Sequence, residues 1–112
     1  MYIPTSVENI EGGEYDYNYY EYIKYGAFSL CRSLRAVTFA VGSQLKNIGK
    51  FAFSECGKLK ITLPERIETI PEACFWKSKI EEIHIPASVK TIGEGAFYEC
   101  MNLQKMTFAG NS

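Results

Sequence analysis

Apolar residues recur along this chain at a spacing longer than any single strand or turn. A phenylalanine marks each copy, at Phe28, Phe53, Phe75 and Phe97, so successive copies are 25, 22 and 22 residues apart. A repeat of this length with apolar residues at constant places is typical of a solenoid, whose coils bury their faces against each other. The pattern therefore predicts about four to five coils of 22–25 residues.

Each repeat divides into three sides. A short alternation of apolar and polar residues, as in Ile83-His84-Ile85, predicts a strand, and successive strands are expected to pair into one parallel sheet on one face. A second apolar edge follows, as in Val89-x-x-Ile92. The third side carries the phenylalanine in the spacing Ala-Phe-x-x-Cys-x-x-Leu, which predicts a 3₁₀ segment or a short helical turn.

The four repeat phenylalanines are expected to form one continuous stack of rings in the core. Truncating a buried ring to alanine typically costs about 3–5 kcal/mol, so this stack should hold the array together. Gly49 and Gly93 are expected to serve tight turns with positive φ. The extra residues Val41-Gly42-Ser43 are expected to form a loop, because they lengthen one coil.

Residues 11–22 interrupt the repeat, because Ile10 and Ile23 fit the same place in it. This insertion holds five of the eight tyrosines, among them Tyr15, Tyr17 and Tyr19, which alternate with acidic residues and Asn18. Such alternation suits an extended segment with one aromatic face, and Gly12-Gly13 is expected to supply a turn. The rings could cover the open N-terminal end of the solenoid or form a contact surface, or the segment could be disordered.

The two ends of the repeat array are expected to be open. Ile3 to Ile10 match Ile85 to Ile92, so the first coil begins with its strand mostly missing. At the other end we expect Leu103, Met106 and Phe108 to be exposed beside an unpaired strand edge. These ends predict self-association into a homo-oligomer, or truncation from a longer array.

Composition limits the classes of partner. The 112 residues fit one domain, residues 1–112, with 46% hydrophobic and 22% charged residues, as in an ordinary globular protein. A net charge of -1 provides no basic field for nucleic acid or anionic lipid. The chain has no apolar run near the ~20 residues that span a bilayer and no signal-peptide pattern, so we expect no membrane insertion, and either an intracellular protein or an omitted export signal.

The four cysteines occupy repeat positions. Cys31, Cys56 and Cys100 each follow a repeat phenylalanine by three residues, and Cys74 stands where other copies have alanine. We expect four reduced and mostly buried thiols that act as small apolar residues. With no C-x-x-C pair and the single His84, the sequence predicts no metal site and no cofactor.

The repeat resembles that of the BspA-type leucine-rich repeat family. The fit is best in residues 83–100, which read Ile83-His84-Ile85-Pro86-Ala87-Ser88-Val89-Lys90-Thr91-Ile92-Gly93-Glu94-Gly95-Ala96-Phe97-Tyr98-Glu99-Cys100. The third copy departs from it at Ile70-Pro71, Cys74 and Ser78. The resemblance implies a right-handed horseshoe from a cell-surface or secreted protein, with adhesion to host or matrix proteins as the suggested role.

Candidate binding residues lie on the outward positions of the predicted strands. By register these are Ala36, Thr38, Lys60, Thr62, Glu82, His84, Lys105 and Thr107. They would form a flat, mildly polar strip for a protein partner, although threonine also simply fits an exposed strand. Trp76 is expected to form an exposed two-ring patch with Tyr98, or to be shielded by the stems of Lys77 and Lys79.

Catalysis is not expected. His84 has Glu81 and Glu82 nearby, but no serine or cysteine nucleophile occupies a matching exposed position in the adjacent coils. The sequence therefore predicts a non-catalytic module that binds an unidentified protein through the strip and the tyrosine-rich insertion. The alternative is a structural spacer or self-associating unit without a dedicated ligand.

Overall fold

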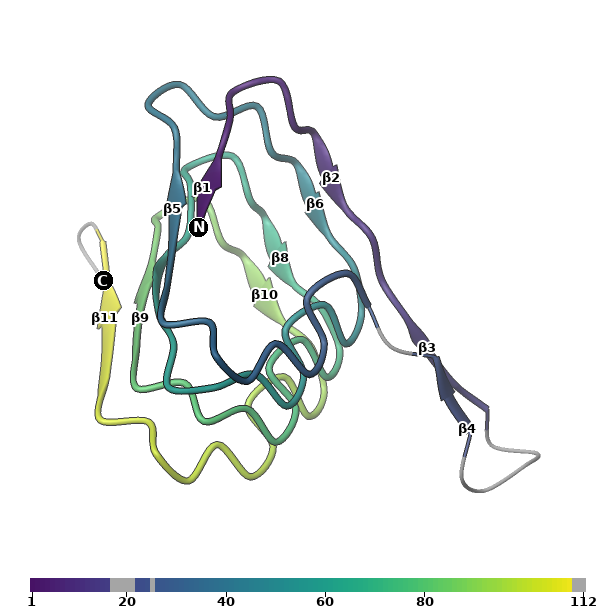
Figure 1. The fold of residues 1–112 in the computed structure, drawn as a ribbon. Helices are drawn as coiled ribbons and strands as arrows, with labels where there is room; N and C mark the ends of the chain where they lie inside the picture. The colour runs from purple at the N-terminus through teal and green to yellow at the C-terminus, as the bar shows by residue number, and fades with distance from the viewer. Residues whose placement is uncertain (17–21, 25, 110–112) are drawn as a thin grey trace.

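The computed structural model describes residues 1–16, 22–24 and 26–109, which wind into a solenoid of three-sided coils (Figure 1). One side is a parallel five-stranded sheet in the order β1-β5-β7-β9-β11. Its strands are β1 (Tyr2–Ile3), β5 (Ala36–Phe39), β7 (Lys60–Thr62), β9 (Glu82–Ile85) and β11 (Lys105–Phe108). The predicted parallel sheet is confirmed, and the strand order shows that each coil adds one strand beside the previous one.

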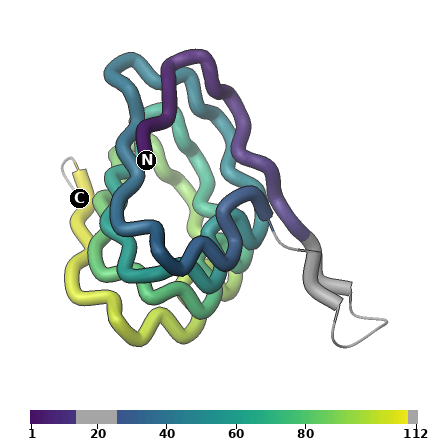
Figure 2. The backbone as a smooth tube through the Cα atoms, in the orientation of Figure 1, coloured from purple at the N-terminus to yellow at the C-terminus, as the bar shows by residue number. Residues whose placement is uncertain are grey.

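The second side of the coils is built from four two-residue strands. They are β2 (Asn9–Ile10), β6 (Asn47–Ile48), β8 (Thr69–Ile70) and β10 (Thr91–Ile92), and they pair in parallel as β2 with β6 and β8 with β10. Apolar side chains from both strand sides meet inside the coil in one core cluster, which includes Val37, Ile61, Ile70 and Ile83. Figure 2 shows the backbone path of these stacked coils.

The third side, which we call the turn side, differs from the prediction. The described residues contain no helix or 3₁₀ segment there, and overlapping turns carry the chain. Residues two places before or after a repeat phenylalanine adopt positive φ, for example Phe51 (61°), Glu55 (51°), Ala73 (55°) and Lys77 (53°). Two left-handed residues four positions apart prevent a right-handed helix from continuing through this side. The predicted 3₁₀ or helical turn is therefore wrong.

Backbone hydrogen bonds explain why this side turns instead of coiling into a helix. The amide of Ser54 donates within its own coil to the Phe51 carbonyl (3.1 Å), whereas the amide of Phe53 donates to Cys74 of the next coil (2.9 Å). The amide of Glu55 likewise donates to the next coil, to the Trp76 carbonyl (2.9 Å). Alternate amides thus bind neighbouring coils, and the turn side satisfies its backbone groups by stacking.

The repeat phenylalanines form the expected column of rings. The centroids of Phe28 and Phe53 are 5.1 Å apart, and those of Phe53–Phe75 and Phe75–Phe97 are 5.4 Å apart. Successive rings lie within 12° of parallel. Phe53 and Phe75 are 0% exposed, while Phe28 and Phe97 are half-buried. The predicted stack is confirmed, with its two central rings fully enclosed.

Gly49 and Gly93 have a different role from the predicted one. Positive φ among the described glycines occurs at Gly42 (77°) and Gly95 (66°) and not at these two. A Cβ on Gly49 would collide with the backbone of Gly12, and one on Gly93 would collide with the backbone of Glu72. These glycines are therefore required by the close approach of adjacent coils and not by turn conformation.

The insertion leaves and rejoins the coil at a closed neck. The amide of Ala27 donates to the carbonyl of Glu11 (3.0 Å), so the backbone on either side of the inserted residues meets again. Beyond this neck, β3 (Glu14–Asp16) and β4 (Tyr22–Lys24) pair in antiparallel fashion, as Figure 1 shows. Gly12-Gly13 does not form the predicted turn, because Gly12 packs against Gly49 and Gly13 donates to Lys50 (2.6 Å).

Three smaller expectations concern the loop and the ends. The loop at Val41-Gly42-Ser43 is confirmed, with Val41 fully exposed and Gly42 at positive φ. The first coil does contain a short strand, because β1 pairs with β5. At the other end Phe108 is 54% exposed, as expected, but Leu103 and Met106 are half-buried against the core cluster.

The four cysteines are free thiols, with Cys56 and Cys74 buried and Cys31 and Cys100 half-buried. The Sγ of Cys56 donates to the Phe28 carbonyl and that of Cys100 to the Phe75 carbonyl, each over 2.9 Å. Burial raises the pKa of Cys56 to about 12 and that of Cys100 to about 11, and it raises the pKa of Cys74 as well. These three thiols therefore stay protonated at neutral pH and serve as packing groups.

Candidate functional site

The predicted outward positions come together on the main sheet as one surface, which we call the strand strip. Its members are Ala36, Thr38, Lys60, Thr62, Glu82, His84, Lys105 and Thr107, all of which line a shallow groove of about 290 Å³. One row of the strip places Lys60, Glu82 and Lys105 opposite each other across β7, β9 and β11. The next row aligns Thr62, His84 and Thr107.

Polar contacts within the strip run across the strands. The His84 ring contacts Thr107 through Nδ1 and Oγ1 at 2.7 Å, and the Lys60 ammonium lies 4.0 Å from the Glu82 carboxylate. Thr38 and Thr62 are exposed, and their hydroxyls have no hydrogen bond within the described part of the chain. The strip therefore offers free hydroxyls beside the Lys60–Glu82 ion pair and the His84–Thr107 hydrogen bond.

Tyr2 extends the strip by one strand, although it is not among the outward positions predicted from the sequence. It lies opposite Thr38 in the pairing of β1 with β5 and is 63% exposed. The repeat pattern predicts a first coil whose strand is mostly missing, so it does not single out this residue. The match of Ile3-Pro4 to Ile85-Pro86 was the available signal, because it places Tyr2 in the slot of His84.

Trp76 and Tyr98 form the second candidate surface, on the turn side. Their ring centroids are 6.2 Å apart and the rings are 14° from parallel, so the predicted two-ring patch is confirmed. Trp76 is half-buried because Phe51 meets its ring edge-on at 6.0 Å and the Lys77 ammonium lies 4.6 Å above it. Tyr98 is 51% exposed and gives this patch most of its free surface.

The tyrosine side chains of the insertion lie outside what the structure describes. Tyr17 and Tyr19 lie outside the described residues, and only the backbone of Tyr15 is described, in β3. The insertion leaves the coil after β2, away from the main sheet (Figure 1). Both interpretations of the rings, as a cover or as a contact surface, stay predictions.

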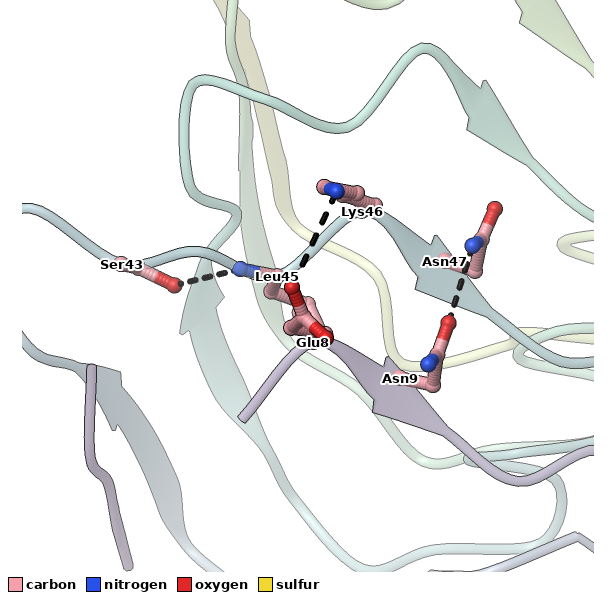
Figure 3. Close-up of polar contacts among 6 residues, drawn as sticks. All are labelled: Glu8, Asn9, Ser43, Leu45, Lys46 and Asn47. Atoms are coloured by element: carbon pink, nitrogen blue, oxygen red, sulfur yellow. Dashed lines mark hydrogen bonds and ion pairs between the residues drawn. The ribbon is translucent and has the colours of Figure 1, made fainter. Parts of the chain in front are cut away.

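The second side carries a polar ladder that the sequence reading did not single out. Figure 3 shows Asn47 donating to the Oδ1 of Asn9 (2.9 Å) from the neighbouring strand, with Lys46 and Glu8 3.8 Å apart beside them. Further along, the hydroxyls of Thr69 and Thr91 are 3.0 Å apart, and Lys90 lies 2.9 Å from Glu68. In each of these pairs the polar groups are each other's partners. The ladder therefore links neighbouring coils and leaves few groups free to bind a ligand.

The ion pair of Lys90 and Glu68 shifts both groups toward their charged forms. The hydrogen bond to Lys90 lowers the pKa of Glu68, and the same contact raises the pKa of Lys90. The signal for this ladder was present in the sequence, because Glu8, Lys46, Glu68 and Lys90 alternate in sign at one repeat position.

The described residues provide no constellation for metal chemistry. No group of three His, Cys, Asp or Glu side chains within them could hold a metal ion. A search of the same residues for a long apolar helix able to cross a bilayer found none. What the geometry offers is surface for contact, on the strand strip and on the aromatic patch.

Comparison with known proteins agrees with this architecture. The sequence model of the BspA type Leucine rich repeat region matches residues 5–112 in six copies. A search of curated proteins gave no significant match. The solved structure of a leucine rich cell surface protein from Faecalibacterium prausnitzii A2-165 is similar to the chain, with a TM-score of 0.58 and 25% identity.

That similarity extends over 99% of this chain but only 32% of the solved one, so the chain spans about a third of the length of its structural relative. Four observations agree with this family: the repeat length, the parallel sheet, the phenylalanine column and the six matched copies. This chain belongs to the BspA-type leucine-rich repeat family.

Proposed function

We propose that this chain is a non-catalytic module that binds another protein through the strand strip, as part of a polypeptide displayed at the cell surface or secreted. The observation that carries the proposal is the groove of about 290 Å³ along four adjacent strands, with exposed Thr38 and Thr62 and the charged row above them. Leucine-rich repeats are typically non-catalytic. The placement at the cell surface rests on the similarity to a leucine rich cell surface protein.

The strip suits a macromolecular partner more than a small molecule. It is open and shallow, and its hydroxyls and charges are spaced by the separation of neighbouring strands, about 4.7–4.9 Å. A small ligand needs a concave site that encloses most of its surface, which an open sheet face does not supply. A protein that covers several strands can instead sum many weak polar contacts.

The test is capture of purified extracellular matrix and serum proteins by the immobilised chain. The variant Thr38→Ala/Thr62→Ala removes two free hydroxyls from the strip. The matched control is Thr69→Ala/Thr91→Ala, which makes the same change on the second side. We expect the first variant to lose capture and the control to retain it. Equal capture by both variants would show that the partner does not bind through the strip.

The rival function is a structural spacer that self-associates through exposed apolar surface. Phe108 and Ile92 are 54% and 46% exposed and line a groove of about 450 Å³, which favours this reading. Replacing Phe108 with serine should then abolish assembly as followed by light scattering across a concentration series. A chain that stays monomeric at every concentration, with or without this change, rules the spacer out.

A further inference from the structure

The positive charge of the chain is gathered on one edge of the solenoid, where the turn side leads into the main sheet. In the first three coils this edge comprises residues 30–36, 55–60 and 77–82, and it contains half of the chain's 12 Lys and Arg but only three of its 13 Asp and Glu. We call it the basic edge, and its cations are Arg32, Arg35, Lys58, Lys60, Lys77 and Lys79. The edge therefore carries +3, and because the chain carries -1, the remaining residues carry -4.

Acids of the next coil neutralise only two of these six charges. Lys60 lies 4.0 Å from Glu82, and Lys77 lies 4.0 Å from Glu99. The other four cations, which take part in no ion pair within the described ranges, are Arg32, Arg35, Lys58 and Lys79. All four are exposed. A surplus of fixed positive charge thus faces solvent on a chain that is acidic elsewhere.

A small hollow lies among these cations. Arg32, Lys77 and Lys79 line it together with Glu55, Cys56 and Gly57, and its volume is about 170 Å³. Gly57 lets the coils approach there, because a Cβ on it would collide with the Arg32 carbonyl and lie 3.3 Å from the guanidinium of Arg35. The hollow is below the roughly 300–1,000 Å³ typical of small-molecule sites, but it has room for one side chain of a larger partner.

We propose that the basic edge binds an acidic polypeptide segment of the partner that lies on the strand strip, with one carboxylate in the hollow between Arg32 and Lys79. This inference rests on the proposed function. Lys60 belongs to both surfaces, so a segment crossing the strip continues onto the basic edge without a gap. The guanidinium of Arg32 can hold a carboxylate with two parallel hydrogen bonds, and Lys79 adds a point charge.

The mixture of signs favours a polypeptide over a uniformly sulfated glycan. Glu55 lines the hollow itself, and Glu82 and Glu99 stand directly beside Lys60 and Lys77. A polyanion with a charge on every unit would meet these carboxylates along with the cations. A polypeptide can place its acids opposite Arg32, Arg35 and Lys79 and leave neutral residues opposite the glutamates.

The test measures binding of a short fluorescein-labelled peptide of alternating glutamate and glycine by fluorescence anisotropy at low salt. We expect the unmodified chain to bind it, and Arg32→Gln/Lys79→Gln to bind it at least about tenfold more weakly. The control Lys46→Gln/Lys90→Gln removes the same charge from the second side and should change the affinity less than about twofold. Raised salt should weaken binding to the unmodified chain, because exposed charges are screened.

Several results overturn the proposal. These are no binding of the acidic peptide, an equal loss in the control variant, or binding of heparin fragments where the peptide does not bind. The same variants also separate this proposal from the proposed function. If Arg32→Gln/Lys79→Gln captures extracellular proteins normally while Thr38→Ala/Thr62→Ala does not, the strip binds the partner and the basic edge does not.

Discussion

The phenylalanine column and the strand strip belong to two different sides of the same three-sided coils and use the repeat in different ways. On the turn side one residue type recurs, and its rings stack at 5.1–5.4 Å in the core. On the sheet face the residue changes from coil to coil in the row Lys60, Glu82, Lys105, while threonine recurs in the next row at Thr38, Thr62 and Thr107. The comparison teaches that recurrence of a buried ring marks residues that hold the solenoid together, while exposed positions of the same coils, recurring or not, are free to serve contact with a partner.

The sharpest way to break this comparison is to remove one central ring. Phe75→Ala should lower the free energy of unfolding by about 3–5 kcal/mol, because the ring is 0% exposed and stacks on both neighbours. Chemical denaturation followed by circular dichroism measures the change. Phe97→Ala, at a half-buried end of the column, should cost less. A loss at Phe75 no greater than that at Phe97 would contradict the central role of the column.

The next largest loss of stability is expected from adding one methyl group between two coils. Gly93→Ala places a Cβ against the backbone of Glu72, which cannot move without separating the coils, and should cost about 1–3 kcal/mol. Gly95→Ala serves as the comparison, because its Cβ has room and only its positive φ of 66° opposes the change. Thermal unfolding of both variants distinguishes crowding from backbone strain. A larger loss at Gly95 would mean that conformation matters more than coil contact.

Thiol chemistry probes the core without a substitution. Because burial raises the pKa of Cys56 to about 12 and of Cys100 to about 11, little thiolate exists at pH 8 and iodoacetamide should label both more slowly than in the unfolded chain by well over about tenfold. The raised pKa values also make the stability of the fold depend on pH. Unfolded thiols lose their protons near pH 9, so stability should fall as the pH rises from there toward about 12. Peptide mass spectrometry reports labelling at each cysteine, and equally fast labelling of native and unfolded chains would show that the coils open.

The smallest effect on stability is expected on the strip. Thr62→Ala should leave the free energy of unfolding within about 0.5 kcal/mol, because the side chain is exposed and has no partner among the described residues. The same change is expected to weaken binding of the protein partner. Calorimetric unfolding together with the capture assay makes the measurement. A variant that loses stability and binding together would show that the threonine supports the fold instead of serving recognition.

Periodicity alone predicted the sheet, the outward register and the ring column, because each depends only on which positions recur. It failed where neighbouring coils determine the backbone. Ala73 and Lys77 adopt positive φ because their amides reach carbonyls of the next coil, at Glu94 and Tyr98, and nothing in their side chains favours that conformation. Gly93 reads as a turn glycine in the sequence, yet it is required by contact with a coil 22 residues away.

The candidate site was predictable only in part for the same reason. The strip follows from strand alternation, so its members were named correctly by position. The basic edge draws Arg32 and Lys79 into one hollow from coils that are far apart in sequence, and their nearness appears only when the coils stack. The side chains of the tyrosine-rich insertion lie outside the described residues, so their contribution stays a prediction.

The closed neck between Glu11 and Ala27 has a consequence for engineering. The 3.0 Å hydrogen bond rejoins the backbone there, and Gly12, Gly13 and Gly26 beside it pack against the neighbouring coil, so these three glycines belong to the stacked coils. The site is suited to grafting, and a foreign epitope or a reporter peptide inserted in place of the sequence between Gly13 and Gly26 should be displayed while the array behind it folds as before. The repeat architecture can therefore acquire new cargo at this junction without redesign of its core.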